Sequence, residues 1–202
     1  MTSHASLPSH ELPFPIRSGA RRAHRLSALL LAAFGVLHLS NHPVALAGPS
    51  VYQSLMDGLR HVYRTPLAEL ALYVAIGVQV VTGWLLFRGA RGARGELRWR
   101  RYSGAVLSFP LVGHALAAQY QRHVVGLDTN FYWAAAVLVW PWALWFVPYY
   151  LVLVTSFVVH VGGVAGLRAS RAALLGVALG AATIAGLLGI FHPVEIPAAY
   201  RR

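Results

Sequence analysis

Long apolar stretches separated by short polar segments dominate the sequence. A helix that crosses the roughly 30 Å hydrocarbon core of a bilayer needs about 20 apolar residues. Five stretches reach that length, near residues 25–46, 66–87, 102–120, 145–167 and 172–192. The pattern therefore predicts an all-α integral membrane protein, with a bundle of five transmembrane helices over residues 21–198.

Two further segments have patterns of their own. Residues 1–20 are polar and contain prolines, without the apolar core of a secretory signal peptide, so we expect a disordered cytoplasmic tail. The stretch 130–146 is apolar and runs directly into the fourth span. Its four tryptophans and Pro141, with Pro148 just beyond, predict an interfacial segment that turns into the fourth helix. Tryptophan favours the headgroup level, and proline interrupts helices.

The composition supports a membrane protein and excludes several chemistries. Hydrophobic residues make up 57% of the 202 positions and charged residues only 11%, too few to cover the surface of a soluble domain. The absence of cysteine excludes disulfides and iron–sulfur clusters held by this chain. The net charge of +11 resides in arginines between the apolar stretches. This placement favours membrane topology and anionic lipid over nucleic acid.

The arginines also predict the orientation of the chain. The five spans place twelve arginines on one side: Arg17, Arg21, Arg22, Arg25, Arg88, Arg91, Arg94, Arg98, Arg100, Arg101, Arg168 and Arg171. The other side has five: Arg60, Arg64, Arg122, Arg201 and Arg202. Because arginine is enriched on the cytoplasmic side, the N-terminus is predicted to be cytoplasmic and the C-terminus outside.

Three histidines lie well inside predicted spans, away from their ends, where ionisable groups are costly and point to function. His38 and His114 each lie 13 residues past a cytoplasmic arginine, about 20 Å along a helix, so they share an outer level. His160 lies 8 residues before Arg168, roughly 12 Å from the cytoplasmic side. Gln79 lies at a similar inner level in the second span.

Two imidazoles from different helices at one depth are suited to axial ligation of a haem iron. Glycines beside these positions, such as Gly35 and Gly113, would leave space for a flat macrocycle. A second interpretation stays open, in which each histidine only hydrogen-bonds a neighbouring helix. His42, near the outer interface, is interpreted as a partner of a haem propionate or water, or as having no special role. The fifth span is rich in small residues and is predicted to be a packing helix.

Four motifs together resemble the five-helix cytochrome b subunit of succinate dehydrogenases and fumarate reductases, the fused type with two b haems. The resemblance covers residues 22–170. It is carried in order by "HRLSALLLAAFGVLHLSNH", "TPLAELALYVAIGVQVVTGWLLF", "GHALAAQ" and "YYLVLVTSFVVHVGGVAGL".

This resemblance implies haem ligands by position. His38 and His114 would hold an outer haem b, and His160 would be one ligand of an inner haem. The family's partner for His160 is a histidine in the second helix, where this chain has Gln79. We therefore expect one haem, held by His38 and His114. An inner haem with His160 and either Gln79, water or no group opposite stays open.

The resemblance also implies partners and a location. A membrane subunit of this kind is not itself catalytic. It anchors flavoprotein and iron–sulfur subunits on the cytoplasmic side of the inner membrane and passes electrons between an iron–sulfur cluster and quinone. This would link the chain to the tricarboxylic acid cycle, in the direction of succinate oxidation or of fumarate reduction.

A quinone site needs hydrogen-bonding groups at an interface beside an apolar slot. The outer candidates are Asp57, Arg60 and His61, and the inner candidates are His24, Arg25 and Ser27. The sequence does not choose between the two sides. Two other functions are weighed against electron transfer: a haem-free membrane anchor or scaffold of the same fold, and a small transporter. The transporter is the weaker, because the chain has no inverted repeat.

Overall fold

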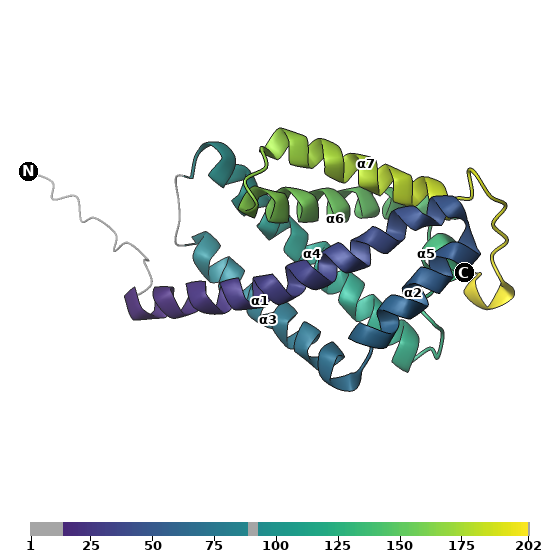
Figure 1. Cartoon of the computed structure of the whole chain (residues 1–202), viewed down its shortest axis with the longest axis horizontal. Helices are drawn as coiled ribbons and strands as arrows, with labels where there is room; N and C mark the ends of the chain where they lie inside the picture. The colour runs from purple at the N-terminus through teal and green to yellow at the C-terminus, as the bar shows by residue number, and fades with distance from the viewer. Residues whose placement is uncertain (1–13, 89–92, 202) are drawn as a thin grey trace, which may run out of the picture.

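The computed structural model describes residues 14–88 and 93–201. Within these ranges the chain is mainly helical and contains no β-strand (Figure 1). The α-helices are α1 Phe14–Asn41, α2 Pro49–Tyr63, α3 Pro66–Arg88, α4 Gly95–His123, α5 Phe131–Ala136, α6 Ala143–Val164 and α7 Ala169–Leu187. Two 3₁₀ helices, η1 His42–Ala47 and η2 Ala198–Tyr200, complete the fold.

Four helical segments are long and apolar enough to cross a membrane: residues 16–47, α3, α6 and α7. They make the chain a multi-pass membrane protein. Helix α4 is long enough as well, but arginines at both ends and polar side chains along its length lower its hydropathy, so it is not among them. Large apolar side chains such as Leu67, Leu70 and Phe109 face outward, as expected of helices that are surrounded by lipid.

Two segments differ from the sequence prediction. The predicted disordered tail extended to residue 20, but α1 begins at Phe14. A proline in the first helical turn costs no backbone hydrogen bond, which explains why Pro15 does not prevent that start. The connection between the first two predicted spans contains the amphipathic helix α2, whose buried residues Tyr52, Met56 and Arg60 recur every four positions.

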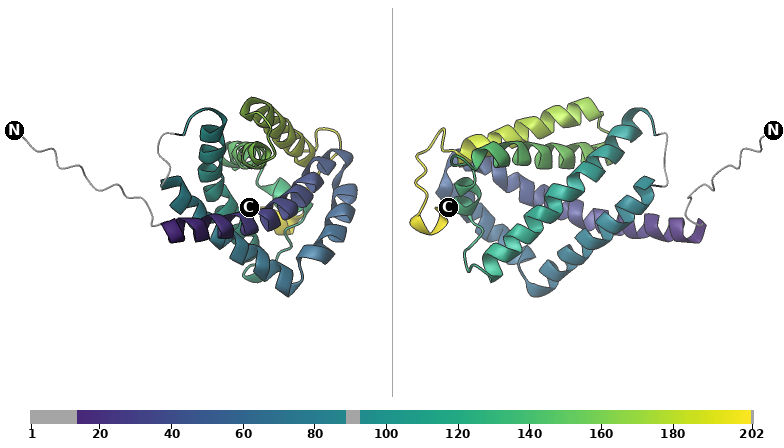
Figure 2. Two further views of the ribbon diagram at one scale, coloured as in Figure 1. Left: turned by 60° about the vertical axis from the view of Figure 1, so that its left-hand side comes forward. Right: turned by 180° about the vertical axis from the view of Figure 1, so that it is seen from behind.

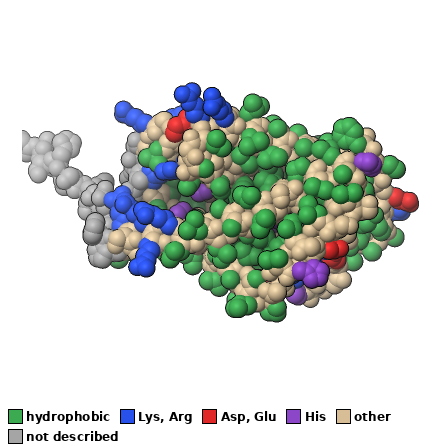
Figure 3. Space-filling model, in the orientation of Figure 1, with side chains coloured by type: hydrophobic (Ala, Val, Ile, Leu, Met, Phe, Trp, Pro, Cys, Tyr) green, Lys and Arg blue, Asp and Glu red, His purple; other side chains and the backbone are tan. Residues whose placement is uncertain are grey.

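The helices form two packed pairs with α4 between them. Helix α1 packs on α3, and α6 packs on α7, while α4 packs mainly on α6 (Figures 1 and 2). One end of the molecule carries the start of α1, the end of α3 and the start of α4 (Figure 1). Arginine side chains gather there, as predicted (Figure 3). This arginine-rich end is predicted to face the cytoplasm.

The hydrophobic core lies toward the opposite end. Phe131 and residues 134–138 are buried against α2, η1, α6 and α7, while Tyr132 and Trp133 are partly buried. The stretch 130–146 therefore behaves differently in its two halves. Its first half is packed inside the protein, which corrects the interfacial prediction. Its second half exposes Trp140 and Trp145 and leads into α6, as expected for an interfacial turn.

Helix α7 packs through small residues, as its sequence predicted. A Cβ atom at Gly176 would lie 2.6 Å from the Thr155 Cα atom of α6. A Cβ atom at Gly186 would lie 2.5 Å from the Ala45 carbonyl carbon of η1. These glycines let backbones approach more closely than any side chain would permit, which is the usual way in which membrane helices associate.

Candidate functional site

The outer-level histidines predicted from the sequence meet in the structure. The imidazole of His38 on α1 and that of His114 on α4 have ring centres 6.0 Å apart, with their planes inclined by 58°. The two helices themselves do not pack closely, because α1 lies mainly on α3 and α4 mainly on α6. The imidazoles therefore reach toward each other from backbones that do not pack side by side.

A third imidazole joins this outer cluster. His42 Nε2 lies 3.3 Å from His38 Nε2, and the Tyr52 hydroxyl lies 3.2 Å from His42 Nδ1. This chain of contacts ties the end of α1 to α2. His42 begins η1 directly after α1 and follows His38 by four positions, so the two imidazoles lie on one face where α1 continues into η1.

Aromatic side chains enclose the outer cluster. Phe34 stacks on His38 with ring centres 5.2 Å apart, and Trp133 of α5 lies 6.2 Å from the ring of His114. Two buried polar atoms here have no hydrogen-bond partner, Asn41 Oδ1 and Trp133 Nε1. Buried polar groups are nearly always paired, so these two atoms have the capacity to bond a group placed beside the cluster.

The donor set suits a haem better than a bare metal ion. Among the described residues, no three histidine or carboxylate side chains are arranged to hold an ion directly. Two imidazoles on one iron each need a bond of about 2 Å, which puts their ring centres roughly 6 Å apart. The His38 and His114 rings have that separation. Gly35 does not provide the expected gap, since Phe157 of α6 fills it.

The inner level is built differently from the prediction. Gln79 was expected to face His160, but it bonds α1 instead. Its amide nitrogen lies 3.1 Å from His24 Nε2, and its Oε1 accepts a 2.7 Å hydrogen bond from Ser27. His24 Nδ1 lies 3.0 Å from the Thr82 hydroxyl, which donates to the Val78 carbonyl. This continuous series of hydrogen bonds joins α1 to α3.

His160 lies elsewhere at the same end. Its Nδ1 atom donates to the carbonyl oxygen of Arg100 on α4, at 2.8 Å. Helices α3 and α6 do not pack together, which explains why Gln79 does not reach it. His24, which the sequence placed among the inner quinone candidates, is the residue that bonds Gln79 at this level.

One outer quinone candidate, Arg60, takes part in a clamp of ion pairs and hydrogen bonds, which consists of Arg60, Arg64, Asp128 and Thr129. Buried Arg60 donates to an Asp128 oxygen at 2.9 Å and to the Thr129 carbonyl at 2.9 Å. Arg64 donates to the other Asp128 oxygen at 3.0 Å and to the Thr129 hydroxyl at 2.8 Å. The clamp holds α2 against the segment between α4 and α5.

The remaining quinone candidates make fewer contacts with other helices. Asp57 is exposed and bonds Arg60 at 3.3 Å, while exposed His61 donates only to a carbonyl of its own helix, that of Asp57, at 2.7 Å. Arg25 is exposed at the arginine-rich end. A separate ion pair joins Glu69 of α3 to Arg122 of α4, where Gln119 also donates to Glu69. These contacts assemble the outer ends of the helices.

The clamp makes stability depend on pH. Partial burial raises the pKa of Asp128, but the hydrogen bond from Arg64 and the charge of Arg60 outweigh it and hold the pKa below its ordinary value. A carboxylate of this kind stabilises the fold above its unfolded pKa and loses that effect as the pH falls through its folded pKa. We expect thermal stability in detergent to fall below about pH 4.

The Asp128→Asn variant tests this expectation. Its unfolding temperature should be lower than that of the wild type near neutral pH, and the two should converge in acid. The more exposed Asp57 provides the control, since Asp57→Asn should leave the acid dependence in place. An unchanged difference between Asp128→Asn and the wild type at every pH would contradict the role of the clamp.

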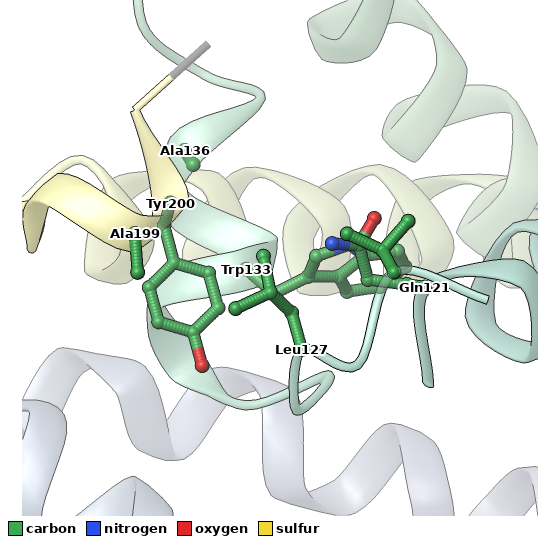
Figure 4. Close-up of a pocket in the computed structure, with 7 residues that line it drawn as sticks. Gln121, Leu127, Trp133, Ala136, Ala199 and Tyr200 are labelled. Carbon is green, nitrogen blue, oxygen red and sulfur yellow. The ribbon is translucent and has the colours of Figure 1, made fainter. Parts of the chain in front are cut away.

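A cleft of about 240 Å³ opens beside the outer cluster. It lies between the end of α4, α5 and η2, and its lining includes Gln121, Leu127, Trp133 and Tyr200 (Figure 4). Trp133 belongs both to this cleft and to the surroundings of His114. The cleft was not anticipated from the sequence, because it depends on the return of residues 198–200 to the end of α4.

Comparisons with protein families, with curated proteins and with solved structures give no match for this chain.

Proposed function

We propose that the chain is a haem b-binding membrane subunit that transfers electrons. It would anchor a soluble flavoprotein and iron–sulfur partner at its arginine-rich end and exchange electrons with membrane quinone. The proposal includes a fifth span at α4, a cytoplasmic N-terminus, an outer C-terminus and location in the inner membrane. In the resembling family, such a subunit belongs to a succinate:quinone oxidoreductase.

The observation that carries the proposal is the approach of His38 and His114. Their ring centres lie 6.0 Å apart although α1 and α4 are not closely packed. Helix bundles build cofactor sites from side chains of facing helices, and two imidazoles are suited to a low-spin haem. The unpaired Asn41 Oδ1 and Trp133 Nε1 beside them add polar atoms that a bound group would satisfy.

Each residue of the outer cluster has a proposed task. His38 and His114 would be the axial ligands, and the iron they hold supplies one-electron chemistry when bound. His42, placed by Tyr52, would orient His38 or bond a propionate. Phe34 and Trp133 exclude water from the imidazoles, because they cover them on two sides.

Quinone binding is proposed at the cleft that shares Trp133 with this cluster. Small-molecule sites combine apolar walls with a few polar groups, and the residues that line the cleft include apolar Leu127 and Val125 beside polar Gln121 and Tyr200. Its volume of about 240 Å³ is suited to a quinone ring. The inner quinone candidates His24 and Ser27 instead form hydrogen bonds with Gln79.

One observation favours a second function, a haem-free anchor. His38 Nε2 already contacts His42, whose other nitrogen contacts Tyr52. This chain braces α1 against α2 without any cofactor. In that case the histidines would be structural and the subunit would only hold its partners at the membrane.

Spectroscopy of the purified full chain separates the two functions. We expect the reduced-minus-oxidised spectrum to show the α-band of a low-spin b-type haem, with at least one haem per chain by pyridine haemochrome assay. A chain that is folded, as judged by circular dichroism, but has no Soret band when produced with ample haem would contradict electron transfer and support the anchor.

A further inference from the structure

The segment after α7 closes one side of the cleft. After α7 ends at Leu187, the chain runs back across the end of the molecule opposite the arginines, and η2 reaches α5 (Figures 1 and 2). Ala199 and Tyr200 of η2 form one side of the cleft, and residues from the end of α4 and from α5 form the other (Figure 4). The cleft is therefore closed only while this segment lies in place.

The segment is anchored in its middle. Val194 and Ile196 are partly buried and pack against the hydrophobic core. In residues 197–201, which we call the lid, every side chain is exposed except that of Tyr200. The backbone hydrogen bonds of the lid, and those of the Arg201 side chain, stay within residues 195–201. The lid can therefore move as one short unit about the anchor at Ile196.

One hydrogen bond joins the lid to the rest of the chain that the structure describes. Asn130 Nδ2 donates to the Tyr200 hydroxyl oxygen at 2.9 Å, a contact that we call the latch. The same side chain caps α5, because its Oδ1 accepts from the Trp133 N–H at 3.1 Å. A backbone N–H can only donate, so the amide oxygen must face α5 and the amide nitrogen must face Tyr200. The cap thus orients the latch.

Little else holds the lid. The Tyr200 ring lies beside that of Tyr132, with ring centres 6.3 Å apart. By contrast, Phe131 is only 1% exposed in the adjacent core. Segments with few buried contacts and few hydrogen bonds open locally far more often than the core unfolds. The lid is such a segment, and the latch is its main restraint.

We propose that residues 197–201 are a lid that opens when the Asn130–Tyr200 hydrogen bond breaks, and that a flat ring from the membrane enters the cleft through this opening. The lid is inferred from contacts alone. The identity of the ring as a quinone rests on the proposed function. When the lid closes again, the Tyr200 ring covers the bound ring, and aromatic side chains pack well on flat rings.

The mouth of the cleft favours a ligand that arrives from lipid. Val125 lines the cleft and is still 46% exposed, and its neighbour Val124 is 69% exposed. Contiguous apolar surface of this kind marks sites that meet apolar partners. A water-soluble ligand would gain nothing from it, whereas a ring on an apolar tail would keep its tail against these valines.

Thiol labelling of the purified full chain in detergent tests the lid, because the chain has no cysteine. Ala136→Cys places a single thiol on the cleft wall, where the native side chain is 6% exposed. Adding Tyr200→Phe removes the latch and keeps the ring. It should raise the maleimide labelling rate about fivefold, the net effect of one hydrogen bond. Asn130→Ser should act alike, since serine still caps α5 but lacks the amide.

Two controls separate the lid from general loosening. Tyr132→Phe removes a neighbouring hydroxyl that makes no hydrogen bond with the described residues, so it should leave the rate unchanged. Ala135→Cys places the thiol in the core, where the native side chain is 2% exposed, and its labelling should not respond to Tyr200→Phe. Equal acceleration at Ala135→Cys and Ala136→Cys, or none at Ala136→Cys, would overturn the lid.

Decyl-ubiquinone separates the lid from its ligand. Bound in the cleft, it should slow the labelling of Ala136→Cys several-fold and leave that of Ala135→Cys unchanged. Faster labelling in Tyr200→Phe without any protection by decyl-ubiquinone or menadione would overturn the entry of a quinone ring and leave the lid in place. The labelling rates do not depend on haem, so a folded chain without haem would overturn the proposed function without affecting the lid.

Discussion

Replacing His114 with alanine is expected to remove one haem per chain. His114 is the only α4 side chain in ring contact with His38, and its ring centre lies 6.0 Å from that of His38. Without it the iron keeps a single axial imidazole, so a low-spin haem becomes high-spin and dissociates more readily. The α-band of the outer haem should disappear from the reduced-minus-oxidised spectrum, and His38→Ala should have the same effect.

The control for this variant lies on the same helix. His123 is exposed at the end of α4, so His123→Ala should leave the haem content unchanged. His42 provides the most discriminating comparison, because its Nε2 lies only 3.3 Å from that of His38. If His42→Ala removed the outer haem while His38→Ala retained it, the axial ligand on α1 would be His42, and the assignment to His38 would be wrong.

The outer level could be predicted because depth along a helix is read directly from the sequence. His38 and His114 lie at equal distances from their arginines, and the structure brings them together. The same argument failed for Gln79 and His160. Equal depth does not specify which helices are neighbours, and α3 packs on α1 instead of α6. The sequence therefore predicted the depth of these side chains in the bundle better than it predicted which side chains contact each other.

The features that were not predicted from the sequence have physical explanations as well. Helix α2 was not predicted, because its polar and charged residues mask a helical period of buried Tyr52, Met56 and Arg60. His24 was interpreted as an interfacial group because it precedes Arg25, yet it turns inward to α3. Its spacing of 14 residues from His38 was the signal that both lie on one face.

Helix α4 does not reach the hydropathy of the four candidate spans. It packs on α6 and carries Ser108, His114 and Gln119 along its length. A helix whose polar side chains make contacts inside the protein needs fewer apolar residues than a helix surrounded by lipid. Its length of 29 residues, about 43 Å, exceeds the hydrocarbon thickness, which is why we propose it as the fifth span.

The second large effect is expected from Gly186→Ala, at the contact of α7 with η1. The added Cβ would lie 2.5 Å from the Ala45 carbonyl carbon and 2.6 Å from the Leu46 nitrogen. These are backbone atoms, which cannot turn aside as a flexible side chain would. Helix α7 must therefore move away from η1, and overpacking of this kind typically costs about 1–3 kcal/mol.

Displacement at Gly186 should also reach the outer cluster, because η1 begins at His42, which contacts His38. We expect Gly186→Ala to lower the unfolding temperature in detergent and to broaden the spectrum of the outer haem. Gly77→Ala on α3 is the matched control, since nothing lies within 4 Å of its added Cβ and alanine favours a helix. Equal unfolding temperatures for Gly186→Ala and Gly77→Ala would show that α7 and η1 separate without cost, which the close backbone packing contradicts.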